Sequence, residues 1–383
     1  MKPDLVARGA SRYVVGDVSR FDQKNEMFKR RRWDESVAWS AKFDDVHMPQ
    51  EDKPGYTLRD LFFANTCWWL EIEFAKGVIS GKEGLYAWDA KQWGETKPPK
   101  GLKLAVNDPL EITRVIKKAA RFFGASLVGV CELDRRWIYS HSYHLITKEH
   151  VPIEIPEEYK YAIAVAVEMD YKGIQGSPTW IGGGATGMGY SKTAFTAGLL
   201  AQYIRGLGWK AIPMGNDTAL SIPIAIDAGL GELSRAGILI TREFGPRVRI
   251  SKVFTDLPLV ADKPIDFGVW EFCMKCGKCA EHCPGQAIDY GEPSDRVNNI
   301  SNNSGLYRWP INAEKCFRYW TAAGTSCANC IRVCPFNKEP GWLHEAVRWG
   351  VKHTPWLDSW FVKVDDLLGY GRQINADEFW QAD

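Results

Sequence analysis

The chain has 383 residues, of which 45% are hydrophobic and 25% are charged, the ordinary composition of a folded globular protein. This composition excludes a disordered or collagen-like chain, and at about 100–200 residues per domain the length predicts two or three structural units. With 48 lysines and arginines against 47 aspartates and glutamates, the net charge is +1, so no strong field would attract nucleic acid or an anionic membrane. No apolar run reaches the ~18 residues of a membrane-spanning helix, and we expect no transmembrane segment.

Residues 1–105 are irregular and rich in tryptophan, and we expect them to form a lid that wraps around the rest of the protein. The first 30 residues lack the apolar stretch of a signal peptide. The basic run at 29–32 is followed by polar residues, unlike a twin-arginine export signal. The best helix candidate is 57–79, which is apolar over most of its circumference and is therefore expected to be buried.

Residues 106–267 alternate between predicted helices and strands. A helix is predicted from Pro109 to Phe123, because Asp108 precedes it and Gly124 follows it as a stop signal. The other predicted elements are strands at 126–130, 161–167, 210–214, 237–241 and 247–254, and helices at 190–207 and 218–228. Alternation of this kind predicts an α/β domain.

The segment 182–189, GGGATGMG, contains the pattern GxGxxG. A dinucleotide site would require a strand directly before it and an acidic residue about 20 positions later. The preceding residues are typical of a loop, and the first acidic residue downstream is Asp217. We therefore expect the glycines to form a turn into a helix that begins at Tyr190, or to let the backbone approach a large flat ligand.

Eight of the ten cysteines lie between 273 and 334, in the patterns Cys-x2-Cys-x2-Cys-x3-Cys-Pro and Cys-x10-Cys-x2-Cys-x3-Cys-Pro. In two-cluster ferredoxins, three closely spaced thiolates hold one cluster and the cysteine before proline holds the other. We therefore predict two [4Fe–4S] clusters. The ligands would be Cys273, Cys276, Cys279 and Cys334 for cluster one, and Cys283, Cys316, Cys327 and Cys330 for cluster two. Zinc and disulfides are the alternatives, but two Cys-x2-Cys-x3-Cys-Pro units together are not a zinc pattern.

The stretch 188–258, which begins MGYSKTAF and includes MGND and GPRVR, closely resembles the corrinoid-dependent reductive dehalogenases. The double cysteine motif with its distant Cys316 fits the same family, so the resemblance covers about 160–338. It implies a nitroreductase-like α/β (α+β) corrinoid-binding core at 106–267, a ferredoxin-like two-cluster domain at 268–338 and a C-terminal wrap at 339–383. It also implies a base-off corrinoid beside the nearer cluster. The chain has no Asp-x-His-x-x-Gly, the motif that supplies a histidine lower ligand, which agrees with that form.

Carried over to this sequence, the resemblance makes Tyr190 the proton donor, Arg249 its cationic partner and Asn216 a polar group of the pocket. These residue types suit the chemistry, because a phenol is a weak acid and an adjacent guanidinium stabilises the phenolate. Thr186 and Trp320 would line the substrate cavity. The implied corrinoid contacts are Met188, Gly189, Met214 and Gly215.

The resemblance implies a respiratory-type reductive dehalogenase that removes chloride from a small organohalide with a Co(I) corrinoid reduced through the two clusters. From overall similarity, not from any single residue, we expect a short chlorinated alkane such as chloroform or a chloroethane. The family also implies an upstream electron donor, a small membrane anchor, and a peripheral location on the outer face of the cytoplasmic membrane after twin-arginine export. The chain itself shows neither the export signal nor the anchor.

Two alternatives remain at this point. Epoxyqueuosine reductase shares the corrinoid core and both clusters but acts on tRNA; it would have a basic face and an aspartate as its acid, which the net charge and Tyr190 do not favour. A non-catalytic two-cluster electron carrier with a structural α/β domain would bind no corrinoid.

Overall fold

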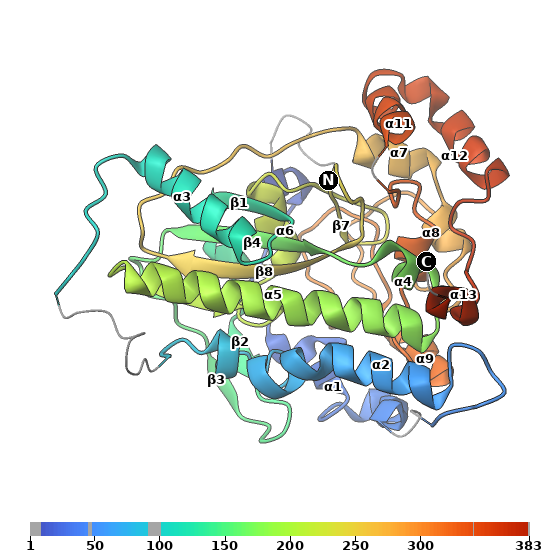
Figure 1. Ribbon diagram of the computed structural model, residues 1–383, viewed down its shortest axis with the longest axis horizontal. Coiled ribbons are helices and arrows are strands. Elements are labelled where there is room, and N and C mark those ends of the chain that lie inside the picture. The colour runs from blue at the N-terminus through green and yellow to red at the C-terminus, as the bar shows by residue number, and fades with distance from the viewer. Residues whose placement is uncertain (1–8, 45–47, 91–100, 340, 382–383) are drawn as a thin grey trace.

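The computed structural model describes residues 9–44, 48–90, 101–339 and 341–381 (Figure 1). The parts of the predicted N-terminal lid at 1–8, 45–47 and 91–100, and of the C-terminal wrap at 340 and 382–383, lie outside these residues. In the part of the chain that the structure describes, no helix combines the length and the apolarity needed to cross a bilayer.

A four-stranded antiparallel sheet forms the centre of the core, in the order β1 (Leu127–Glu132), β4 (Tyr161–Glu168), β8 (Val248–Thr255) and β5 (Ala211–Met214). These are the strands predicted at 126–130, 161–167, 247–254 and 210–214. The connection from β4 to β5 joins two strands that run parallel, but β8 lies between them and pairs antiparallel with both. The core is therefore the α+β form of the expected fold, not a parallel α/β sheet.

Both faces of the central strand β4 are buried. Ile163, Val165 and Val167 belong to the apolar cluster that includes residues of α3 (Pro109–Phe122) and α5 (Trp180–Gly206). The alternate positions, Ala162, Ala164 and Ala166, belong to the cluster that includes residues of α6 (Ser221–Asp227). A strand covered on both sides carries a continuous apolar run, which is why the sequence predicted it well.

The glycine-rich segment 182–189 is helical, which corrects the expected turn or loop. It forms part of α5, which begins at Trp180, ten residues before the predicted start. The glycines let α2 (Leu58–Trp69) lie against α5 (Figure 1): a Cβ at Gly184 would be 2.6 Å from Phe63 Cε1, and one at Gly187 would be 2.4 Å from Trp68 Cδ1. Glycine disfavours a helix by about 1 kcal/mol per residue, but here close packing between the two helices decides the conformation.

The helix predicted at 57–79 is α2 continued by a π-helical turn, η4 (Leu70–Ala75), and it ends at Lys76, whose φ of 58° is left-handed. The strand predicted at 237–241 is reduced to β7 (Leu239–Ile240), which pairs with β6 (Glu232–Leu233) outside the main sheet. Another separate pair is the hairpin of β2 (His141–Tyr143) and β3 (His150–Pro152), which was not predicted.

The cysteine-rich region lies at one end of α5 (Figure 1), and it contains four helices. They are α7 (Val269–Lys275), α8 (Lys278–Glu281), α9 (Ala313–Ala323) and α10 (Asn329–Arg332). The C-terminal segment forms α11 (Trp342–His353), α12 (Asp358–Leu367) and α13 (Ala376–Trp380). Trp380 reaches back to α2, because its Nε1 donates to Asp60 Oδ1 at 2.7 Å.

The remaining described elements are short, and most belong to the N-terminal region. They are η1 (Gly9–Tyr13), η2 (Gln23–Asn25), α1 (Met27–Arg30), η3 (Glu35–Asp44), η5 (Gly84–Tyr86), η7 (Arg135–Trp137), α4 (Tyr171–Gln175) and η8 (Pro355–Leu357).

Candidate active site

Tyr190, Asn216 and Arg249 come together from three different elements. Tyr190 lies on α5, Asn216 follows β5, and Arg249 lies on β8. Asn216 Nδ2 donates to Tyr190 Oη at 2.8 Å, and the Arg249 guanidinium lies 5.0 Å from the centroid of the Tyr190 ring. Because Tyr190 Oη accepts this hydrogen bond, its own proton is free to be donated to another group.

Trp68 is a site residue that the sequence analysis missed. Its ring stacks on Tyr190 with the centroids 5.1 Å apart and the planes at 26°, and its Nε1 donates to the carbonyl oxygen of Gly183 at 3.0 Å. The helix that carries Trp68 was predicted at 57–79, but no local pattern distinguishes this tryptophan from the other sixteen.

A directed chain of hydrogen bonds supports Asn216. Lys252 Nζ donates to Ser221 Oγ at 2.8 Å, and Ser221 Oγ donates to Asn216 Oδ1 at 3.1 Å. Since Oδ1 is occupied by the serine, the Nδ2 group is turned toward Tyr190. Lys252 is completely buried and also donates to the carbonyl oxygens of Gly215 and Ala219. This lysine therefore fixes the loop that carries Asn216.

Buried ionisable groups surround Lys252. Burial lowers the pKa of Lys252 to about 8, while the charges of Asp217 and Glu26 act in the opposite direction. Burial raises the pKa of Asp217 to about 6 and that of Glu26 to about 7. Tyr139 Oη lies 2.7 Å from Glu26 Oε1 and 3.1 Å from the carbonyl oxygen of Asn216. The loop that carries Asn216 therefore packs against buried ionisable side chains, which no sequence motif had predicted.

None of the eight clustered cysteines forms a disulfide, and the structure brings them together in two groups. Burial raises the pKa of Cys279 and of Cys334, and after burial the largest effect on each is the nearby Cys273. Burial likewise raises the pKa of Cys316, followed by the effects of Cys330, Cys327 and Cys283. Four converging thiols are the donor set of one [4Fe–4S] cluster, so each group fits a cluster.

One cavity connects the two groups. Its lining includes all four predicted ligands of cluster one and also Cys330 of cluster two, with Phe272 and Phe336 among the apolar residues around them. The two groups of thiols are therefore adjacent, as one-electron transfer between clusters requires.

Arg249 acts electrostatically on the second group of thiols as well as contacting Tyr190. Burial raises the pKa of Cys330 to about 12, and the charge of Arg249 acts in the opposite direction. Arg249 Nη2 donates to Thr186 Oγ1 at 3.4 Å, whereas its Nε is buried without a hydrogen-bond partner. Leaving a buried donor without a partner costs free energy. Arg249 Nε is therefore suited to donate a hydrogen bond to a polar group of a bound ligand.

The other predicted site residues occupy different environments. Thr186 is buried beside Arg249, and Trp320 of α9 packs on Phe28 with an unpartnered Nε1. Met188 exposes 39% of its surface. Gly189 is buried, and a Cβ there would lie 2.8 Å from Arg249 Cγ.

Two of the predicted corrinoid contacts lie in the interior. Met214 is fully buried in the apolar core, and its contact with a corrinoid stays a prediction. Gly215 is also buried, and a Cβ there would lie 2.8 Å from Tyr86 Oη. Its carbonyl oxygen is already bound by Lys252, so Gly215 supports the loop.

Residues 272–337 match the family model described as a 4Fe–4S double cluster binding domain. The chain is 38% identical over 343 residues to the tetrachloroethene reductive dehalogenase of Sulfurospirillum multivorans, an alignment that covers 82% of this chain and 68% of that protein. The chain belongs to the reductive dehalogenase family. The predicted family is thereby confirmed.

Other reductive dehalogenases agree with this assignment. The tetrachloroethene reductive dehalogenase of Dehalobacter restrictus is 37% identical over 335 residues, covering 77% of this chain and 60% of that protein. A solved structure titled as a reductive dehalogenase that suggests a mechanism for B12-dependent dehalogenation matches with a TM-score of 0.75 and 25% identity. That match covers 94% of this chain and 48% of the other, so the chain spans about half the length of that dehalogenase. The predicted fold class, a mixed helix-and-sheet core with a two-cluster domain, is confirmed.

Proposed function

We propose that this reductive dehalogenase replaces a carbon-bound halogen of a small organohalide by hydrogen. The overall reaction takes up two electrons and one proton and releases a halide ion. The observation that carries the proposal is Tyr190, held by the amide of Asn216 and the guanidinium of Arg249 beside a cysteine of cluster two. A base-off corrinoid, when bound here, would supply the low-valent cobalt that removes the halogen. Arg249 Nε and the exposed Met188 are the groups we propose to contact it.

Tyr190 is proposed as the proton donor. The hydrogen bond from Asn216 leaves the phenol proton free for the carbon atom that loses the halogen. When the proton has left, the phenolate keeps the Asn216 hydrogen bond and gains the attraction of the Arg249 charge. Trp68 stacks on the Tyr190 ring and helps to hold the phenol in place.

Electrons are proposed to enter at cluster one, held by Cys273, Cys276, Cys279 and Cys334, and to pass to cluster two. The cavity that borders both groups of thiols supports transfer between them, and the effect of the Arg249 charge on Cys330 supports cluster two as the one nearer to Tyr190. By family resemblance, an upstream donor would deliver these electrons, and a membrane anchor would hold the enzyme on the outer face of the cytoplasmic membrane.

The substrate is proposed to be a small chlorinated aliphatic compound. The names of the two tetrachloroethene reductive dehalogenases support chlorinated ethenes. The chlorinated alkanes expected from the sequence stay a prediction, and both classes belong in the same assay.

The test is anaerobic reconstitution with iron, sulfide and corrinoid, followed by metal analysis and by chloride release from tetrachloroethene and chloroform. We expect one cobalt and about eight irons per chain, the sum of two [4Fe–4S] clusters. Tyr190→Phe should keep the metals but lower the turnover number by about 10²–10⁴-fold, the usual contribution of a general acid. Tyr203→Phe is the matched control, because Tyr203 lies on the same helix and packs on Phe123.

Two outcomes would contradict the proposal. Eight irons without cobalt, under conditions where corrinoid was supplied, would favour the two-cluster electron carrier. Full chloride release by Tyr190→Phe would show that another group donates the proton.

A further inference from the structure

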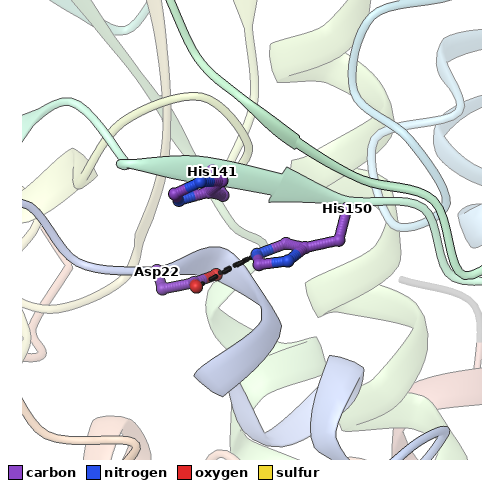
Figure 2. Close-up of side chains that lie close together, drawn as sticks. All are labelled: Asp22, His141 and His150. Carbon is purple, nitrogen blue, oxygen red and sulfur yellow. Dashed lines mark hydrogen bonds and ion pairs between the residues drawn. The ribbon is translucent and has the colours of Figure 1, made fainter.

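Asp22, His141 and His150 form a compact group of potential metal ligands at the β2–β3 hairpin (Figure 2). Asp22 directly precedes η2, and the two histidines lie on β2 and β3 of the hairpin. One potential ligand atom from each residue lies within 4.8 Å of the other two, and His150 Nε2 is 3.0 Å from both carboxylate oxygens of Asp22. The reductive dehalogenase site uses none of these residues.

The backbone holds the three side chains in register before any ion binds. On one side of Asp22, the Ser140 amide donates to the carbonyl oxygen of Phe21 at 2.9 Å. On the other side, the Tyr143 amide donates to Gln23 Oε1 at 3.0 Å. The residues flanking Asp22 are therefore already attached to the hairpin, so an ion would not have to bring the two segments together.

Neighbouring groups also orient the ligand atoms. His141 Nδ1 lies 3.1 Å from Ser140 Oγ, which leaves Nε2 as the nitrogen available to a metal. Asp22 Oδ1 accepts from the Lys24 amide at 3.0 Å as the cap of η2, which fixes the carboxylate plane. Metal-binding histidines and carboxylates in proteins commonly have such outer partners.

We propose that Asp22, His141 and His150 bind one divalent transition-metal ion of the zinc class, with water completing the coordination. Two imidazoles and one carboxylate are a ligand set that such ions accept. Zinc–ligand distances near 2.0–2.2 Å require the ligand atoms to approach each other more closely than now. Rotation of the partly exposed His150 and Asp22 side chains supplies that movement.

The charges around these three side chains permit a cation to bind. Lys24 is a competing charge: its Nζ lies 4.0 Å from Asp22 Oδ2, and its side chain is 37% exposed. Lys24 also lies over the ring of Trp33 at 5.5 Å, so it can move toward that ring and into water when an ion takes its place. The ion would then tie Asp22 to a hairpin that follows it by more than a hundred residues.

Zinc analysis of the anaerobically purified enzyme with its clusters in place tests this proposal, because iron then occupies the cluster cysteines. After equilibrium dialysis against Zn²⁺, we expect one zinc per chain beyond the cluster metals, and a higher unfolding temperature. His150→Ala and Asp22→Asn should each weaken zinc binding at least about tenfold, and Asn at position 22 can still cap η2. His353→Ala is the matched control, because His353 is an exposed histidine on α11 outside this group.

The proposal does not depend on dehalogenase activity, and its readout is metal content. Zinc retained equally by the wild type, His150→Ala and Asp22→Asn would overturn it, because the ion would then bind elsewhere. Absence of retained zinc from the wild type, or loss of zinc in His353→Ala, would also overturn it.

Discussion

At the scale of single residues, the role proposed for Tyr190 also depends on the direction of the hydrogen bonds around it. Ser221 accepts from Lys252 and donates to Asn216, and this arrangement turns the Asn216 amide toward Tyr190. Ser221→Ala would free the amide to rotate, so that Tyr190 Oη loses its fixed donor. We expect the turnover number to fall about tenfold, the rate equivalent of about 1.4 kcal/mol, with KM little changed.

Ser221→Thr is the matched control, because threonine keeps the hydroxyl group. Steady-state kinetics of both variants over a range of pH would separate a positioning role from a packing role. If Ser221→Thr and Ser221→Ala lost activity equally, the hydroxyl would not be what positions Asn216.

At the scale of elements, the close approach of α2 and α5 depends on glycine. A Cβ at Gly187 would lie 2.4 Å from the indole of Trp68, which also stacks on Tyr190. We expect Gly187→Ala to destabilise the protein by about 1–3 kcal/mol through overpacking, measured by denaturant unfolding and circular dichroism. Gly206→Ala, on the same helix with no atom within 4 Å of the added Cβ, should instead stabilise by about 0.5–1 kcal/mol. Equal effects at both positions would contradict this account.

At the scale of the whole molecule, the C-terminal helices are attached to the cluster region by buried charges. Asp365 of α12 accepts from Lys278 Nζ at 2.5 Å and pairs with Lys338 Nζ at 2.6 Å, and all three side chains are at least nine-tenths buried. Lys278 lies between two predicted cluster-one ligands, so this group fixes the C-terminal wrap beside that cluster.

Asp365→Ala would leave two lysines buried without their shared partner. We expect a loss of about 3–5 kcal/mol in unfolding free energy and faster iron loss to a chelator, followed by visible absorbance. The adjacent Asp366, whose side chain is 56% exposed and which also pairs with Lys278, serves as the control. Asp366→Ala should cost less than about 1 kcal/mol; a loss as large as that of Asp365→Ala would mean that burial of the pair is not decisive.

The sequence by itself determined those features of this protein that depend on residues close together in the chain. The cysteine spacing predicted a two-cluster domain because three closely spaced thiolates can hold the same cluster, and the matched family model confirms that domain. The apolar run of β4 predicted a buried strand because both of its faces are covered. Tyr190, Asn216 and Arg249 were named through family resemblance, and their roles stay proposals.

Only the tertiary structure decided which distant side chains meet. The stacking of Trp68 on Tyr190, the support of Asn216 by Lys252 and the meeting of Asp22 with His141 and His150 join segments far apart in the chain. The structure also made the glycine-rich segment helical, because the packing of α2 against α5 outweighs the low helix propensity of glycine. Short-range patterns specify local geometry, whereas contacts between segments arise only when the folded core brings them together.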